Sequence, residues 1–120
     1  MSEQAGPDIP AAAGRVTIAP AVLAQIVERA TLGTPGVVAM CTRHPRFDRL
    51  RDRTFRDTPS GIHLHLIDDT VHAEIAIVAQ ASVNIVNLGQ RIQQEVGGAL
   101  EHIAGLRAGE INVYVDDIAP

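Results

Sequence analysis

The sequence predicts a single α+β domain in which two helices lie on one face of a mixed, mostly antiparallel sheet. Apolar residues recur at helical spacing in two segments and alternate with polar residues in several shorter ones. Two of the alternating segments flank a turn-forming pair, Asp69-Thr70, which favours a hairpin. The predicted order is strand, helix, strand, loop, strand, strand, helix, strand. At 120 residues the chain is long enough to bury one hydrophobic core, but too short to form both a catalytic domain and a separate binding domain.

The predicted domain begins after a short lead-in. Residues 1–13 are rich in Ala, Pro and Gly without periodicity, so we expect them to be disordered and the folded domain to span residues 14–120. Polar and apolar residues alternate over Arg15–Ile18, which predicts a short strand.

The first helix is expected to begin at Pro20, because proline suits the first turn of a helix. Its apolar positions recur at helical spacing: Val22, Leu23, Ile26, Val27 and Ala30. The glycines and proline of Gly33–Gly36 end this helix. Val37–Cys41 then reads as a short apolar strand.

Residues 42–60 lack periodicity and are predicted to form a long polar loop. The chain has no lysine, and six of its ten arginines fall here: Arg43, Arg46, Arg49, Arg51, Arg53 and Arg56. With three aspartates the loop carries a formal charge of +3. Because the net charge of the chain is −4, the rest of the chain carries −7. Guanidinium groups suit bidentate binding of phosphate or carboxylate, which makes this loop a candidate surface for a partner or an anion. The alternative is a solvated loop with internal Arg–Asp pairs.

The hairpin is the clearest strand pattern in the chain. Gly61–Asp68 and Val71–Gln80 alternate in polarity on either side of the turn, and pairing Asp68 with Val71 gives each strand one apolar face. The apolar face would contain Ile62, Leu64, Leu66, Val71, Ala73, Ile75 and Ile77. The opposite face, called here the histidine face, would contain His63, His65, His72 and Glu74. We expect the apolar face to pack in the core and the histidine face to be open.

The second helix is expected to follow Asn84, which can cap it, and to end at Gly105. Its apolar stripe consists of Ile85, Leu88, Ile92, Val96, Ala99, Leu100 and Ile103. Ile111, Val113 and Val115 alternate with polar residues and predict a final strand.

Composition excludes several kinds of chemistry. Without lysine the chain can build neither a Walker phosphate-binding loop nor a Schiff-base nucleophile. The single cysteine, Cys41, cannot form an internal disulfide or a multi-cysteine zinc site. No apolar run approaches the roughly 18 residues of a membrane span, and the first ten residues lack the pattern of a signal peptide. We therefore expect a soluble cytoplasmic protein.

The histidine face is the candidate metal site of the sequence. Three imidazoles and a carboxylate are ligands suited to zinc, and such a site could serve a metal-dependent hydrolase. The competing interpretation is that these are the solvent-facing positions of a half-exposed sheet, without a wall or an outer shell of hydrogen bonds to orient the rings. We favour the second interpretation and expect no metal, no cofactor and no catalytic residue. Cys41, near Arg43 and His44, could be a reactive thiol, but no orienting acid is identifiable.

Several strings over residues 14–118 have a characteristic order and spacing. They are Gly14–Pro20 (GRVTIAP), Pro35–Met40 (PGVVAM), Val83–Ile85 (VNI), Ile103–Leu106 (IAGL) and Glu110–Val115 (EINVYV). Together they resemble the alkaline shock protein family of bacteria. The arginine-rich loop and the absence of lysine set this sequence apart from its apparent relatives.

This resemblance implies a small, non-enzymatic protein of the bacterial cytoplasm linked to cell-envelope homeostasis and stress tolerance. Some relatives form larger assemblies and are held at the membrane by a separate anchoring protein. We therefore expect a self-associating scaffold or adaptor at the cytoplasmic side of the membrane, with a membrane-anchored protein as partner. A module that binds nucleic acid or phosphate through residues 43–56 is the alternative, and a metal-dependent hydrolase using the histidine face is the less favoured one.

The alternative makes a direct prediction about salt. If residues 43–56 bind nucleic acid, the affinity falls steeply as salt is raised, because each neutralised phosphate releases counterions. Replacing the six loop arginines by alanine should reduce both the affinity and its salt dependence, as measured by fluorescence anisotropy with a labelled oligonucleotide. Binding that is absent, or independent of salt, would rule this alternative out.

Overall fold

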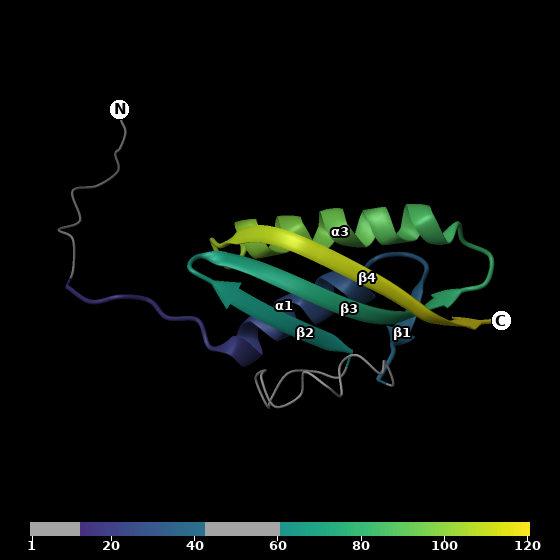
Figure 1. The fold of residues 1–120 in the computed structure, drawn as a ribbon, viewed down its shortest axis with the longest axis horizontal. Coiled ribbons are helices and arrows are strands. Elements are labelled where there is room, and N and C mark those ends of the chain that lie inside the picture. The colour runs from purple at the N-terminus through teal and green to yellow at the C-terminus, as the bar shows by residue number, and fades with distance from the viewer. Residues whose placement is uncertain (1–12, 43–60) are drawn as a thin grey trace.

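The computed structural model describes residues 13–42 and 61–120, in which the chain forms two helices and four strands (Figure 1). In chain order these are α1 (Pro20–Leu32), β1 (Val37–Met40), β2 (Ile62–Ile67), β3 (Thr70–Gln80), α3 (Ile85–His102) and β4 (Arg107–Ala119). The predicted α+β class is confirmed. The predicted lead-in and most of the predicted loop lie outside the described residues, so they stay predictions.

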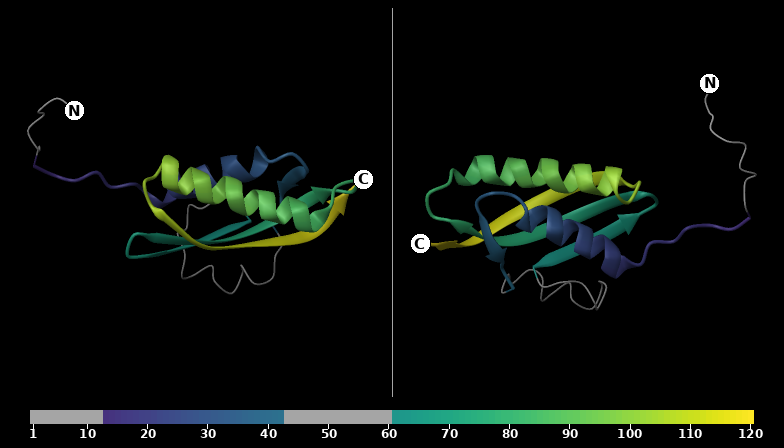
Figure 2. Two further views of the ribbon diagram at one scale, coloured as in Figure 1. Left: turned by 90° about the horizontal axis from the view of Figure 1, so that it is seen from above. Right: turned by 180° about the vertical axis from the view of Figure 1, so that it is seen from behind.

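Strand β3 is the centre of the sheet. β1 and β2 both run antiparallel to it along one edge, β1 beside its C-terminal half and β2 beside its N-terminal half. β4 runs parallel to β3 along the other edge. Parallel neighbours need a crossover connection, and α3 supplies it here. The sheet is therefore mixed and mostly antiparallel, as predicted, and both helices cover the same face of it (Figure 2).

The hairpin turn lies one residue earlier than predicted. Ile67 pairs with Thr70 and Asp68-Asp69 forms the turn, so the predicted pairing of Asp68 with Val71 is wrong. Asp68 adopts a φ of 57°, a left-handed conformation that aspartate tolerates better than most residues. Val71 pairs instead with Leu66, a shift of two residues. Because side chains alternate with a period of two, this shift leaves the predicted membership of both faces intact.

The strand predicted over Arg15–Ile18 is also wrong. These residues pair with no other strand in the part of the chain that the structure describes. The side chain of Val16 is 95% exposed, so the alternation there does not correspond to a buried face. The segment leads directly into α1, whose first residue, Pro20, has no backbone N–H to leave unbonded.

Helix α1 buries one stripe of small and branched side chains: Leu23, Ala24, Val27 and Thr31. The Thr31 hydroxyl donates to the Val27 carbonyl at 2.7 Å, which satisfies this buried polar group. The helix ends before Gly33 as predicted, but the left-handed residue is Gly36, with a φ of 105°. A β-carbon at Gly36 would also press on Val83 and Leu88, so both conformation and space require glycine there.

Helix α3 begins as predicted, with the Asn84 side chain accepting from the backbone N–H of Asn87 at 3.0 Å. Its buried residues are spaced four apart: Leu88, Ile92, Val96 and Leu100. Ile103, predicted to extend this stripe, lies at the C-cap and is exposed. The core therefore lies between these helices and the apolar face of β2 and β3.

The buried stripe of α3 gives a stability prediction with a matched control. Val96 is fully buried, whereas Val86 on the same helix is 68% exposed. Val96→Ala should lower the free energy of unfolding by about 2 kcal/mol, through lost burial and the cavity left behind. Val86→Ala should change it by less than about 0.5 kcal/mol. Urea unfolding followed by circular dichroism measures both, and equal effects would contradict the described packing.

Candidate functional site

The register of the hairpin sets the geometry of the histidine face. His63 lies directly opposite Glu74, and His65 lies opposite His72. Directly opposed residues of an antiparallel pair point to the same side of the sheet. All four predicted side chains therefore share the sheet face that is opposite to the helices, as predicted.

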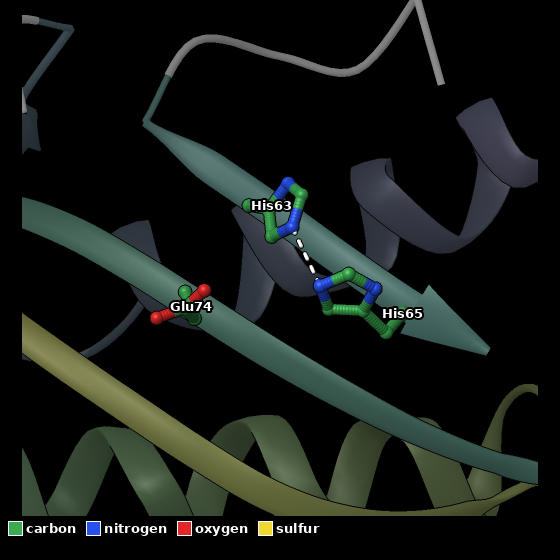
Figure 3. A group of neighbouring side chains, drawn as sticks. All are labelled: His63, His65 and Glu74. Carbon is green, nitrogen blue, oxygen red and sulfur yellow. Dashed lines mark hydrogen bonds between the residues drawn. The ribbon is translucent and has the colours of Figure 1, made fainter. Parts of the chain in front are cut away.

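Three of the four side chains form a close cluster (Figure 3). The Nε2 atoms of His63 and His65 are 2.7 Å apart, and the two rings meet edge to face at 83°. One ligand atom each from His63, His65 and Glu74 can be chosen so that all three lie within 4.8 Å of one another. His63 is 2% exposed and Glu74 is 6% exposed, whereas His65 is exposed. The expectation of an open face is therefore wrong for His63 and Glu74.

Tyr114 on β4 also belongs to this cluster, and sequence reasoning missed it. β4 pairs with the other edge of β3, with Asn112 beside Glu74 and Tyr114 beside Ala76. From there the Tyr114 hydroxyl donates to Glu74 Oε1 at 2.7 Å. The alternation of β4 predicted that Tyr114 would point away from the core, but not which strand lies next to it. The cluster thus draws on β2, β3 and β4.

His72 is held apart from the cluster. Its Nδ1 accepts the backbone N–H of Glu110 on β4 at 3.1 Å, so the neutral ring carries its proton on Nε2. Gly109 allows this contact, because a β-carbon there would collide with the His72 ring and with Thr70. His72 therefore contacts the backbone of β4 and is not one of the three clustered side chains.

A second candidate site is a groove between the two helices, with a volume of about 580 Å³. It is lined by Ile26, Arg29 and Ala30 of α1 and by Gln94, Glu95, Gly98, Ala99, His102 and Ile103 of α3 and its C-cap. Its walls combine small residues, two isoleucines and a pair of opposite charges. Because both helices cover the same face of the sheet, this groove and the histidine face lie on opposite sides of it. The groove was not anticipated, since the sequence pattern does not reveal which helix faces meet.

The remaining predicted site residues that the structure describes belong to neither the polar cluster nor the groove. All six loop arginines, together with His44, lie outside the described residues, so their proposed roles stay predictions. Cys41 is a partly exposed free thiol just after β1. Asp68-Asp69 forms the hairpin turn, and the Asp117 carboxylate accepts the N–H of Ile118 at 2.8 Å.

The structure is thus that of a small two-layer α+β domain with a polar cluster on one side and an apolar groove on the other. The chain belongs to the alkaline shock protein 23 family, which has a cell envelope-related function; the family model matches residues 8–120. The family suggested by the sequence strings is therefore confirmed. No described helix combines the length and apolar character needed to cross a membrane.

Solved structures share the fold at low sequence identity. The nickel form of one substituted MamM CTD is 12% identical with a TM-score of 0.55, covering 80% of this chain and 95% of that chain. The cadmium form of another is 13% identical with a TM-score of 0.55, covering 80% and 94%. A cysteine-to-serine variant is 12% identical with a TM-score of 0.56, covering 82% and 95%. No curated protein matches the sequence. At these identities the likeness shows the fold alone.

The contact between Tyr114 and Glu74 gives a prediction for the polar cluster. Tyr114→Phe removes the hydrogen bond to a buried carboxylate and should lower the free energy of unfolding by about 1–3 kcal/mol. Asn112→Ala, at an exposed position on the same strand, is the control and should change it by less than about 0.5 kcal/mol. Both are measured by urea unfolding. A fully stable Tyr114→Phe variant would show that the hydroxyl has no structural role.

Proposed function

We propose that this protein is a non-catalytic, self-associating adaptor of the cell envelope, acting at the cytoplasmic side of the membrane. The groove between α1 and α3 is the observation that carries this proposal. Its occupant is the same helical face of a second copy of the chain. The family assignment supports the link to the envelope, and the features of the groove support the contact.

The shape of the groove suits close approach of another helix. Ala30, Gly98 and Ala99 leave room between the helices, and at Gly98 an added β-carbon would meet nothing closer than the His102 ring at 4.0 Å. Ile26 and Ile103 supply apolar side chains to the walls. Ridges of one helix pair can pack into such a groove at an interaxial distance of roughly 8–10 Å.

Apolar exposure extends the contact along α1. Val22 lies four residues before Ile26, on the same helical face as Arg29, and it is exposed. Val22 thereby lengthens the apolar strip beyond the groove, whose own wall includes the exposed Ile103. A stable interface needs roughly 800 Å² per partner, so contact along the full length of both helices is required.

The charges on the groove are self-complementary. Arg29 comes from α1 and Glu95 from α3. In a two-fold contact the same patch serves both copies, so Arg29 of one copy can face Glu95 of the other, twice. Such pairs set register and orientation more than they set affinity.

A membrane-anchored protein is the proposed second partner, because the family is envelope-related. The arginines of residues 43–56 are the proposed contact, on the strength of their charge alone. A self-associating adaptor of this kind presents several copies of such a contact, which raises the overall avidity.

Charge reversal tests the proposed self-association. Arg29→Glu and Glu95→Arg should each weaken the oligomer at least tenfold, because like charges then face each other. The double variant should regain the wild-type dissociation constant, as measured by sedimentation velocity over a range of concentrations.

Glu110→Arg is the matched control, because it makes the same change in charge as Glu95→Arg at an exposed position of β4. It is expected to leave the oligomer intact. A wild-type protein that remains monomeric at every concentration would contradict the proposal. So would a double variant no better than the single ones.

A further inference from the structure

We propose that His63, His65 and Glu74 form a binding site for one divalent transition metal ion of the zinc type. The inference does not rest on the groove or on self-association, because the cluster lies on the other side of the sheet. It revises the sequence-based preference for a merely solvated histidine face, on the strength of three features of the structure.

The first feature is convergence of the ligand atoms. His63 and His65 are two residues apart on β2, so both rings project from the same side of one strand. Glu74 lies directly across from His63 on β3, and the three ligand atoms lie within 4.8 Å of one another. Figure 3 shows the two rings edge to face with the carboxylate beside them. Two imidazoles and one carboxylate are a known ligand set of zinc sites with an open fourth position.

The second feature is how little the rings must move. Nε2 atoms bound to one tetrahedral zinc ion at about 2.05 Å lie about 3.3 Å apart. The observed separation is 2.7 Å, so the two rings need to open only slightly relative to each other, while the Glu74 carboxylate lies within 4.8 Å of both. In the metal-free pair one Nε2 donates its proton to the other. Binding of a metal to both Nε2 atoms requires this proton to leave its Nε2.

The third feature is the support around the ligands, which the sequence pattern did not show. His63 and Glu74 are buried, so their orientations are fixed by packing. The Tyr114 hydroxyl donates to Glu74 Oε1 and orients that carboxylate. Such outer hydrogen bonds typically change metal affinity 10- to 100-fold. His65 is exposed, so the metal can enter from solvent and keep a water ligand on that side.

The ligand types set the metal class. Imidazole nitrogen suits Zn²⁺ and its neighbours in the transition series, whereas Mg²⁺ and Ca²⁺ require oxygen ligands. His72 contributes no ligand, because its Nδ1 accepts the N–H of Glu110. It therefore offers a control on the same sheet face.

The test is a titration of the full chain, first stripped with a chelator, with ZnCl₂ and separately with MgCl₂. Calorimetry should give one Zn²⁺ per chain, and Mg²⁺ should not bind. Tyr114 is the single tyrosine and the chain has no tryptophan, so tyrosine fluorescence reports on this cluster directly. Zn²⁺ should change it with the same midpoint as the heat signal.

His65→Ala is the decisive variant, because an exposed side chain can be removed without unfolding the core. It should weaken Zn²⁺ binding at least 100-fold, while His72→Ala retains it. Tyr114→Phe should weaken it 10- to 100-fold in calorimetry. Zn²⁺ should also raise the unfolding midpoint of wild type and of His72→Ala, but not of His65→Ala. Unchanged Zn²⁺ affinity in His65→Ala, or no Zn²⁺ binding by wild type, would overturn the proposal.

Discussion

The pairing of β3 on both edges is the constraint on which the rest of the structure depends. Its eleven residues bond to β1 and β2 on one side and to β4 on the other. Because β3 is paired on both edges, its backbone groups are mostly used within the sheet, and its side chains determine the character of each face. Ile75 and Ile77 point into the helical layer, and Glu74 points to the opposite face. Both candidate surfaces are therefore defined relative to this strand.

The two surfaces differ in the forces that build them. The inner side of the helical layer is held to the sheet by hydrophobic burial. The groove lies on the outer side of this layer, so it is lined by helix residues that are not fully buried in the core. The polar cluster is held by register, because His63 meets Glu74 only in one pairing of β2 with β3. Substitutions in the groove should be tolerated by the fold, whereas a register change would dismantle the cluster.

Sequence reasoning recovered what depends on local periodicity. The stripe of α3, its Asn84 cap and the two faces of the hairpin follow from spacings of four and two residues. It failed at Arg15–Ile18, where the alternating residues join no described strand although Ile18 packs against the core, and it placed the turn one residue late. It could not reveal the Tyr114–Glu74 contact, since forty residues and a crossover helix separate the two. It also judged the histidine face open, because burial of His63 depends on tertiary packing.

The place of β4 in the sheet also bears on the order of folding. β4 follows every other described element in the chain, yet it pairs with the full length of the central strand. During synthesis one edge of β3 therefore stays unpaired until Arg107–Ala119 has emerged. The hydrogen bond from Tyr114 to the Glu74 carboxylate cannot form before then. Parallel pairing across so long a separation is slow to form, and an open edge invites pairing with other chains. The nascent chain is thus exposed to such pairing until β4 has emerged.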